Sequence, residues 1–163
     1  MSAESVRSQA RKGPDSLEAT PRAPFFVDSN VLIYAHDRSA GSKHEAAKAL
    51  IEGLWEDRAG CLSVQVLQEF FVNVTRKVRS PLGVAEARQV ISDLSYWKVH
   101  RPDAFDVLAA IDIHRRTRIS FWDAMIVESA AAQSCNVLYS EDLGDGQVYE
   151  GVRVKNPIPD GGA

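Results

Sequence analysis

The chain has 163 residues, of which 45% are apolar and 25% are charged, and its formal net charge is −3. This composition predicts one globular domain with a core of its own, and the acidic balance excludes a protein that coats nucleic acid by bulk positive charge. Cys61 and Cys135 have no C-x-x-C spacing, so we expect neither a zinc site nor a disulfide framework. No apolar run is long enough to span a membrane and no apolar signal segment is seen, so we expect a cytoplasmic protein.

Composition divides the chain into an extension, a domain and a tail. Residues 1–23 are polar, mixed in charge and interrupted by proline, which predicts a disordered or weakly ordered extension. Residues 24–155 carry the apolar periodicity of a folded domain, and residues 156–163 form a short C-terminal tail.

Within the domain, short apolar runs alternate with longer segments of helical periodicity. In chain order we first expect a strand at 25–27, a short helix that Ser29 or Asn30 caps and that ends at Tyr34, a helix at 43–57 and a strand at 60–62. Helices at 63–78 and 85–94 and a strand at 96–100 follow. The last expected elements are helices at 103–116 and 120–134, a strand at 136–139 and a fifth strand at 152–154. On the helix at 63–78 the expected apolar face is Val64, Leu67, Phe71 and Val74. This alternation predicts an α/β layer fold with a mostly parallel sheet.

Two acidic residues follow predicted strands. Asp28 ends the first strand, in FFVDSN, and Asp142 lies just past the fourth, in LYSEDLGDG. Parallel sheets bind ligands at the carboxyl ends of their strands, so both carboxylates lie where an active site is expected. The ordinary alternatives are a helix cap or solvated loop acid for Asp28, and turn chemistry for Asp142 with its neighbours Glu141 and Asp145.

Two further acids lie on predicted helices. Glu69, in SVQVLQEFFVNVTRK, falls at the edge between the apolar face and a polar stripe, where a solvated glutamate is the ordinary explanation. Asp123, in SFWDAMIVESA, follows Ser120 with the S-x-x-D spacing of a capping box, which explains it structurally. The first helical turn is also a place where the helix dipole favours an anion.

The combination of these acids is more informative than any one of them. An α/β fold can bring a strand end, a first helical turn, a helix edge and a post-strand loop to one rim. Carboxylates gathered without lysine or arginine cannot all stay ionised unless cations are present. Mg²⁺ or Mn²⁺ bound by oxygen ligands is the usual answer, and such ions support phosphodiester hydrolysis.

Four segments, VDSNVLIYAHD, QEFFVNVTRK, ISFWDAMIVESA and LYSEDLGDGQ, resemble in order and spacing the four motifs of PIN-domain nucleases, and most of all the VapC-type toxins of bacterial toxin–antitoxin pairs. The resemblance covers roughly residues 24–155. It implies a three-layer α/β/α fold with a central sheet of four to five strands. It also implies four catalytic, metal-binding acids: Asp28, Glu69, Asp123 and Asp142.

Members of the family are single-domain Mg²⁺- or Mn²⁺-dependent endoribonucleases, often homodimers, that a cognate antitoxin protein inhibits by occupying the active-site groove. The resemblance therefore implies an RNA substrate, an antitoxin partner and a homodimer. It places Asn30 and Ser140 beside the acids as supporting polar residues. Because the family varies in the acidic loop, the choice among Glu141, Asp142 and Asp145 as the metal-facing acid stays open.

An acidic protein needs local positive charge to hold RNA. Two basic segments could supply it, TRKVR with Arg76, Lys77 and Arg79, and HRRTR with Arg115, Arg116 and Arg118. Such residues contact phosphates and give salt-dependent affinity rather than sequence choice. A solvated helix end explains them equally well. Trp97 and Trp122, expected to be exposed, are candidates for stacking on bases, although tryptophan more often packs in a core.

Three other functions remain to be weighed. A catalytically inactive PIN-like binding module is disfavoured because all four acidic positions are filled. A phosphotransfer domain would need a D-x-D motif or a lysine paired with the strand-end aspartate, but the first strand is followed by D-S-N and no lysine follows the late strand near LYSED. A nuclease acting on DNA instead of RNA is an alternative that the motifs alone do not separate.

Overall fold

The computed structural model describes residues 24–160, so the expected extension at residues 1–23 lies outside the described residues. Its six helices and mostly parallel sheet form a three-layer α/β/α fold, as expected. The helices are α1 Ser29–His36, α2 Ser42–Asp57, α3 Val64–Arg76, α4 Val84–Leu94, α5 Ala104–Thr117 and α6 Phe121–Ala132, with a 3₁₀ turn at Arg38–Ala40. No helix within residues 24–160 is long and apolar enough to cross a membrane.

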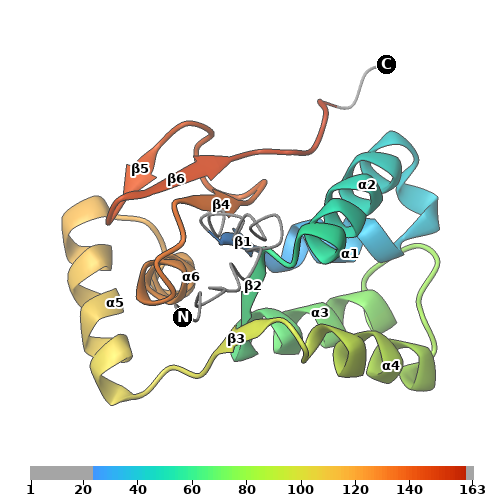
Figure 1. The fold of residues 1–163 in the computed structure, drawn as a ribbon, viewed down its shortest axis with the longest axis horizontal. Helices are drawn as coiled ribbons and strands as arrows, with labels where there is room; N and C mark the ends of the chain where they lie inside the picture. The colour runs from blue at the N-terminus through green and yellow to red at the C-terminus, as the bar shows by residue number, and fades with distance from the viewer. Residues whose placement is uncertain (1–23, 161–163) are drawn as a thin grey trace, which may run out of the picture.

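The sheet has the strand order β3-β2-β1-β4-β6-β5. Its strands are β1 Phe25–Val27, β2 Gly60–Ser63, β3 Lys98–His100, β4 Val137–Tyr139, β5 Val148–Tyr149 and β6 Val152–Lys155. All neighbouring pairs are parallel except β5 with β6. Figure 1 shows α5 and α6 on one side of the strands and α1 to α4 on the other.

One strand of the sheet was not expected. The hairpin of β5 and β6 turns through Glu150 and Gly151, both with positive φ, and pairs Tyr149 with Val152. Positive φ at both central residues is the geometry that makes a two-residue hairpin. The usual sequence signals for that turn are Asn-Gly and Asp-Gly, so a two-residue strand followed by Glu-Gly gave no clear prediction.

The local details of α1 and α3 also differ from the expectation. Asp28, rather than Ser29 or Asn30, is the N-cap of α1, and the helix continues two residues past Tyr34 to His36. On α3 the buried side chains are Val66, Phe70 and Val74, whereas Val64, Leu67 and Phe71 are only partly buried. The face that contacts the core is therefore rotated from the expected one, because β2 and α1 determine which side is covered.

Trp97 is buried, which corrects the expectation that it is exposed. Its side chain is only 9% accessible, and its ring packs edge-on against Trp55 with centroids 5.3 Å apart. The ring also lies where any Cβ on Gly60 would be, so glycine at the start of β2 makes room for it. Trp97 therefore belongs to the core and has no free face on which a base could stack. Trp122 is exposed as expected, with 63% of its surface accessible.

Candidate active site

Asp28 lies at the end of β1, where the strand meets α1, and only 3% of its surface is accessible. One carboxylate oxygen, Oδ1, accepts a hydrogen bond from the backbone N–H of Ser29 at 2.7 Å, and the other, Oδ2, accepts from the Ser140 hydroxyl at 2.7 Å. Burial raises the pKa of Asp28 to about 7 against the lowering effect of these two hydrogen bonds, and repulsion from Glu69 and Asp142 adds to the rise. The bonds therefore offset only part of the cost of burying this charge.

Ser140 joins the end of β4 to the end of β1. The strands pair side by side, and the Asp28 N–H donates to the Tyr139 carbonyl at 2.9 Å. The fully buried Ser140 hydroxyl donates to Asp28 and accepts from the Asp142 N–H at 3.2 Å and from Asn30 Nδ2 at 3.5 Å. Because a hydroxyl has one proton and two lone pairs, this arrangement uses its whole bonding capacity. Ser140 thus fixes Asp28, Asn30 and the acidic loop relative to one another.

Glu69 reaches the same place from α3. Its Oε2 accepts a hydrogen bond from the Ser29 hydroxyl at 2.7 Å, and its Oε1 accepts from Gln65 Nε2 at 2.9 Å. Gln65 also donates to the backbone carbonyl of Trp122 at 3.2 Å. One glutamine therefore connects Glu69 on α3 to the first turn of α6, where Asp123 lies. Glu69 is a bonded member of the site and not a solvated helix glutamate.

Asp123 is half-buried in the first turn of α6. Its N–H donates to the Ser120 hydroxyl at 3.0 Å, but among the described hydrogen bonds the reciprocal bond of a capping box is absent. The Asp123 carboxylate is therefore not used as a cap. Burial raises the pKa of Asp123 against the lowering effect of Ser120, and Asp142 and Glu69 raise it further by repulsion.

The four predicted acids act on one another electrostatically. Glu69 and Asp142 each raise the pKa of both Asp28, at the end of β1, and Asp123, in the first turn of α6. No cation is among the described groups that shift the pKa of either residue. Within residues 24–160, no lysine or arginine is therefore among the groups that offset the mutual repulsion felt by Asp28 and Asp123.

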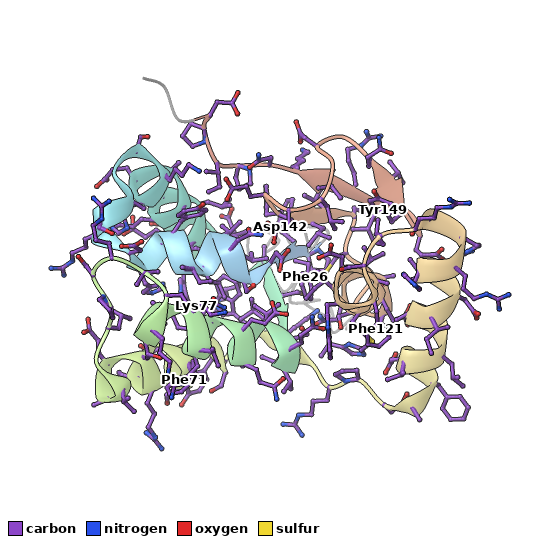
Figure 2. The ribbon with its side chains drawn as sticks, turned by 180° about the vertical axis from the view of Figure 1, so that it is seen from behind. Phe26, Phe71, Lys77, Phe121, Asp142 and Tyr149 are labelled. Carbon is purple, nitrogen blue, oxygen red and sulfur yellow. The ribbon has the colours of Figure 1, made fainter. Side chains whose placement is uncertain are left out.

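The three acids of the loop after β4 have different surroundings. Glu141 forms an ion pair with Lys43 at 3.0 Å, and Asp145 accepts a hydrogen bond from the Asn156 N–H at 2.9 Å. Asp142 and Asp145 are both exposed, and Asp142 is the one whose charge acts on Asp28 and Asp123. The geometry thus favours Asp142 over its two neighbours as the loop's contribution to the site. Figure 2 labels Asp142 after β4 and Phe26 in neighbouring β1.

The chemistry of the donors fits a hard divalent cation. The site offers carboxylate, amide and hydroxyl oxygens and no sulfur or imidazole, which is the ligand type of Mg²⁺ and Mn²⁺. Within residues 24–160, however, no three His, Cys, Asp or Glu side chains are arranged closely enough to hold a metal ion. Asp28 and Glu69 are instead turned toward Ser140, Ser29 and Gln65. Oxygen ligands of the required kind are therefore present, and the carboxylates of Asp28 and Glu69 bond to hydroxyl and amide donors.

The predicted basic residues do not gather in one place. Lys77 lines a groove of about 480 Å³ with Asn30, Lys43, Asn73 and Arg79, so this part of TRKVR opens beside the acids. Arg76, exposed in the last turn of α3, is not among the lining residues.

The HRRTR segment lies elsewhere. Arg115 and Arg116 line a separate hollow on α5, and Arg116 forms an ion pair with Glu150. Arg118 ends α5 in a left-handed conformation. The described contacts give these three arginines no connection to the acids.

Sequence reasoning missed three residues that shape the site. Ser29 was considered only as a helix cap, yet its hydroxyl donates to Glu69. Gln65 was given no role in the sequence analysis, and position 43 appeared there only as the start of a helix. For Gln65 the i, i+4 spacing to Glu69 was a usable signal. The pairing of Lys43 with Glu141 spans 98 positions and had no local signal.

Comparisons with known proteins identify the family and the fold. Residues 25–145 match the PIN domain family, whereas among curated proteins none matches this chain. A similar solved structure is VapC20 of Mycobacterium tuberculosis, described as a sarcin-ricin loop cleaving toxin, with 22% identity, coverage of 72% of this chain and 89% of that one, and a TM-score of 0.58.

Two similar structures are complexes. DNA-bound VapBC from Salmonella typhimurium has 16% identity, coverage of 84% and 100%, and a TM-score of 0.59. A toxin–antitoxin complex from Klebsiella pneumoniae has 17% identity, coverage of 83% and 98%, and a TM-score of 0.59. At these identities the likeness establishes a shared fold. Together with the match over residues 25–145, it leads to one conclusion: this chain belongs to the PIN domain family.

Proposed function

We propose that this protein is a metal-dependent endoribonuclease and the toxin of a toxin–antitoxin pair. The observation that supports the proposal is that the charges of Glu69 and Asp142 both act on Asp28 and on Asp123 near the carboxyl end of the sheet, with no cation among the described groups that act on these two acids. Such a cluster is costly for a fold to keep, because each carboxylate opposes ionisation of the next. A divalent cation that binds all or most of them would remove that cost.

Asp28 and Asp123 are the proposed primary ligands of Mg²⁺ or Mn²⁺, and Glu69 and Asp142 would bind a second ion or orient water. A bound ion of this kind lowers the pKa of water and offsets charge on a phosphate. The chain's own contribution is positioning. Ser140 and the Ser29 N–H hold Asp28, while the Ser29 hydroxyl and Gln65 hold Glu69. In the metal-free protein, the raised pKa of Asp28 means that this carboxyl retains a proton up to about pH 7.

The proposed reaction is hydrolysis of the RNA phosphodiester backbone by water. Within residues 24–160, no described hydrogen bond pairs a serine, cysteine or histidine nucleophile with a base at these acids, and the two hydroxyls of Ser29 and Ser140 already donate to Glu69 and Asp28. We therefore expect products with a 5′-phosphate and a 3′-hydroxyl. The groove with Lys43, Lys77 and Arg79 supports a polyanionic substrate, since phosphate contacts come from such side chains.

RNA is proposed over DNA because a structural relative, VapC20, is described as cleaving the sarcin-ricin loop. An antitoxin partner is proposed because other relatives were solved as toxin–antitoxin complexes. The homodimer and the cytoplasmic location rest on the family resemblance. The apolar side chains exposed on α5, Phe105, Leu108 and Ile111, make that helix the first surface to test for self-association.

The alternative of an inactive binding module keeps the fold and loses the chemistry. It predicts that the acids are dispensable, whereas the bonded positions of Asp28 and Glu69 support a selected arrangement. A DNA nuclease would use the same four acids but would bind DNA instead of RNA in the groove. One assay separates all three functions, because it varies both the substrate and the metal.

The test is cleavage of matched single-stranded RNA, single-stranded DNA and total cellular RNA by purified protein free of antitoxin. Each reaction is run with Mg²⁺, with Mn²⁺ and with EDTA. Metal-dependent cutting of RNA with ligatable 5′-phosphate ends is the expected result. Preferential cutting of DNA would show that DNA, and not RNA, is the substrate. Intact nucleic acid under every condition would favour the binding module.

A further inference from the structure

Lys43 of α2 is held at the edge of the acidic site. Its ammonium lies 3.0 Å from Glu141 Oε1, 3.4 Å from the Tyr34 hydroxyl, and 5.1 Å from the centroid of the Tyr34 ring. The Lys43 and Glu141 side chains are 30% and 27% accessible, so a ligand can reach the pair. Glu141 directly precedes Asp142, the acid of this loop that acts on Asp28 and Asp123.

The partner of Lys43 is fixed to the site by its backbone. The Glu141 N–H donates to Asn30 Oδ1 at 3.2 Å, and Asn30 in turn contacts Ser140 at 3.5 Å. Asn30 and Lys43 are also lining residues of the groove described above. The Lys43 ammonium is therefore located where the groove meets the acidic loop.

The groove itself favours anions. Lys43, Lys77 and Arg79 line it, and Figure 2 labels Lys77 at the end of α3. One acid, Asp37, also lines it, but its Oδ1 already accepts hydrogen bonds from the N–H and the hydroxyl of Ser39. Because the cations come from α2 and from the segment after α3, they line the groove from two sides.

We propose that Lys43 binds a phosphate of the RNA strand adjoining the cleavage site, and that Glu141 occupies the Lys43 ammonium until the RNA displaces it. A phosphodiester carries one negative charge and presents oxygen acceptors, as the Glu141 carboxylate does. The two therefore compete for the same cation. Glu141 weakens RNA binding in this account, although it keeps Lys43 extended toward the groove in the free protein. The inference rests on the proposed ribonuclease function.

A single-stranded RNA fits this arrangement better than an acidic peptide does. Its phosphates repeat along the strand, so one can contact Lys43 while others contact Lys77 and Arg79 and another lies at the four acids. An acidic peptide offers carboxylates to the same cations, but it has no phosphodiester for the four acids to act on. An acidic peptide is therefore treated as a competing outcome of the test.

The experiment measures affinity for a fluorescein-labelled single-stranded RNA by anisotropy in EDTA, where the proposed reaction does not run. The variants are Lys43→Met, Glu141→Gln and the double variant. Lys98→Met is the matched control, because Lys98 is exposed on β3 and lines a different hollow beside Cys61. Circular dichroism and thermal unfolding confirm that each variant is folded.

We expect Lys43→Met to weaken RNA binding about fivefold and Glu141→Gln to tighten it about threefold at low salt, the range that single exposed charge contacts give. The slope of log K against log salt should fall by about 0.7 in Lys43→Met, as for one lost phosphate contact on a single strand. Glu141→Gln should have no effect when Lys43 is already methionine, since the two residues act through one contact.

Equal effects of Lys43→Met and Lys98→Met, or tightening by Glu141→Gln in the Lys43→Met background, would overturn the inference, because bulk charge would then explain the data. Poly-glutamate binding as tight as RNA binding would overturn the choice of ligand. If the wild-type protein cleaves RNA but the variants bind RNA as the wild type does, the ribonuclease proposal holds and the inference about Lys43 fails. Wild-type protein that binds RNA through Lys43 without cleaving it leaves the binding site standing and removes the nuclease.

Discussion

The hydroxyl of Ser140 donates a 2.7 Å hydrogen bond to the carboxylate of Asp28, a residue 112 positions earlier in the chain. The bond exists because β1 and β4 are parallel neighbours whose ends coincide, with Val27 opposite Tyr139. A carboxylate buried at the end of an apolar strand needs a partner, and this hydrogen bond supplies one. In this structure the partners are a hydroxyl and a backbone amide, and in the proposed working state a metal ion would be added.

Ser140→Ala should weaken metal binding and cleavage together. The substitution leaves Asp28 Oδ2 without its donor and removes the acceptor of the Asp142 N–H, so a cost of about 1–3 kcal/mol in unfolding free energy is expected for the unsatisfied buried groups. Thermal unfolding and calorimetric titration with Mn²⁺ measure both effects. Ser140→Thr retains the hydroxyl and serves as the control. Full metal affinity in Ser140→Ala would show that the hydrogen bond does not position Asp28.

The stability of the metal-free protein should depend on the ionisation of Asp28. Its pKa in the folded state is raised from 3.8 to about 7, so the folded protein holds this proton more tightly than the unfolded chain does. The favourable contribution is complete below pH 3.8 and is lost as pH rises through about 7, by an amount on the order of 4 kcal/mol. Denaturant unfolding of wild type and Asp28→Asn, compared from pH 4 to pH 8 in EDTA, measures it.

The difference in unfolding free energy between the two proteins should shift in favour of Asp28→Asn as pH rises, because asparagine does not ionise. Saturating Mg²⁺ should reduce the shift, since a bound cation favours the ionised carboxylate. A constant difference across this pH range would show that Asp28 titrates at an ordinary pKa.

Substitution of Asp142 and of Asp145, both in the acidic loop, should affect RNA cleavage differently. Asp142→Asn should reduce metal-dependent RNA cleavage by about a hundredfold, the scale at which one electrostatic contact in an active site acts. Asp145→Asn should leave cleavage within about threefold of wild type, because its carboxylate bonds to the Asn156 N–H and an amide oxygen can accept the same bond. Initial rates on one RNA substrate at equal protein concentration provide the comparison. Equal losses at both positions would contradict the assignment of Asp142.

Self-association, if it covers α5, should depend on Leu108. Leu108 is 57% accessible and Phe105 is 80% accessible on the same helix, an exposure of apolar surface that dimer formation would remove from water. Light scattering after size exclusion should give a dimer for wild type and a monomer for Leu108→Asp. Glu52→Gln, at an exposed position of α2 on the other side of the sheet, should leave the mass unchanged. A wild-type monomer would refute the homodimer.

The sequence was most informative where an apolar run ended in a polar residue. FFVD and LYSED placed Asp28 at a strand end and Asp142 just past another, so these two positions could be predicted from local pattern and fold class, whereas the expectation that Ser140 lies beside the acids came from the family resemblance. Elements bounded by turn residues were also predictable, such as the break before α4. The strand β5 was not, because two residues leading into a Glu-Gly turn carry almost no periodicity.

Tertiary contacts decided what the local pattern could not. Which side of α3 is buried depends on α1 and β2, and the burial of Trp97 depends on the space above Gly60. The division of the basic residues followed from the path of the chain. Lys77 reaches the groove beside Asn30, while Arg116 pairs with Glu150 across α5 and the β5–β6 turn. Side chains that meet across such distances in sequence give no spacing signal.

The measurement that tests the central claim most directly is cleavage of one defined RNA by wild type, Asp28→Asn and Asp145→Asn in Mg²⁺ and in EDTA, with all three proteins shown to be folded. The account predicts Mg²⁺-dependent cutting by wild type and Asp145→Asn, and none above background by Asp28→Asn or by any protein in EDTA. Equal cutting by wild type and Asp28→Asn, or no cutting by folded wild type, would contradict the claim that these four acids form a nuclease site.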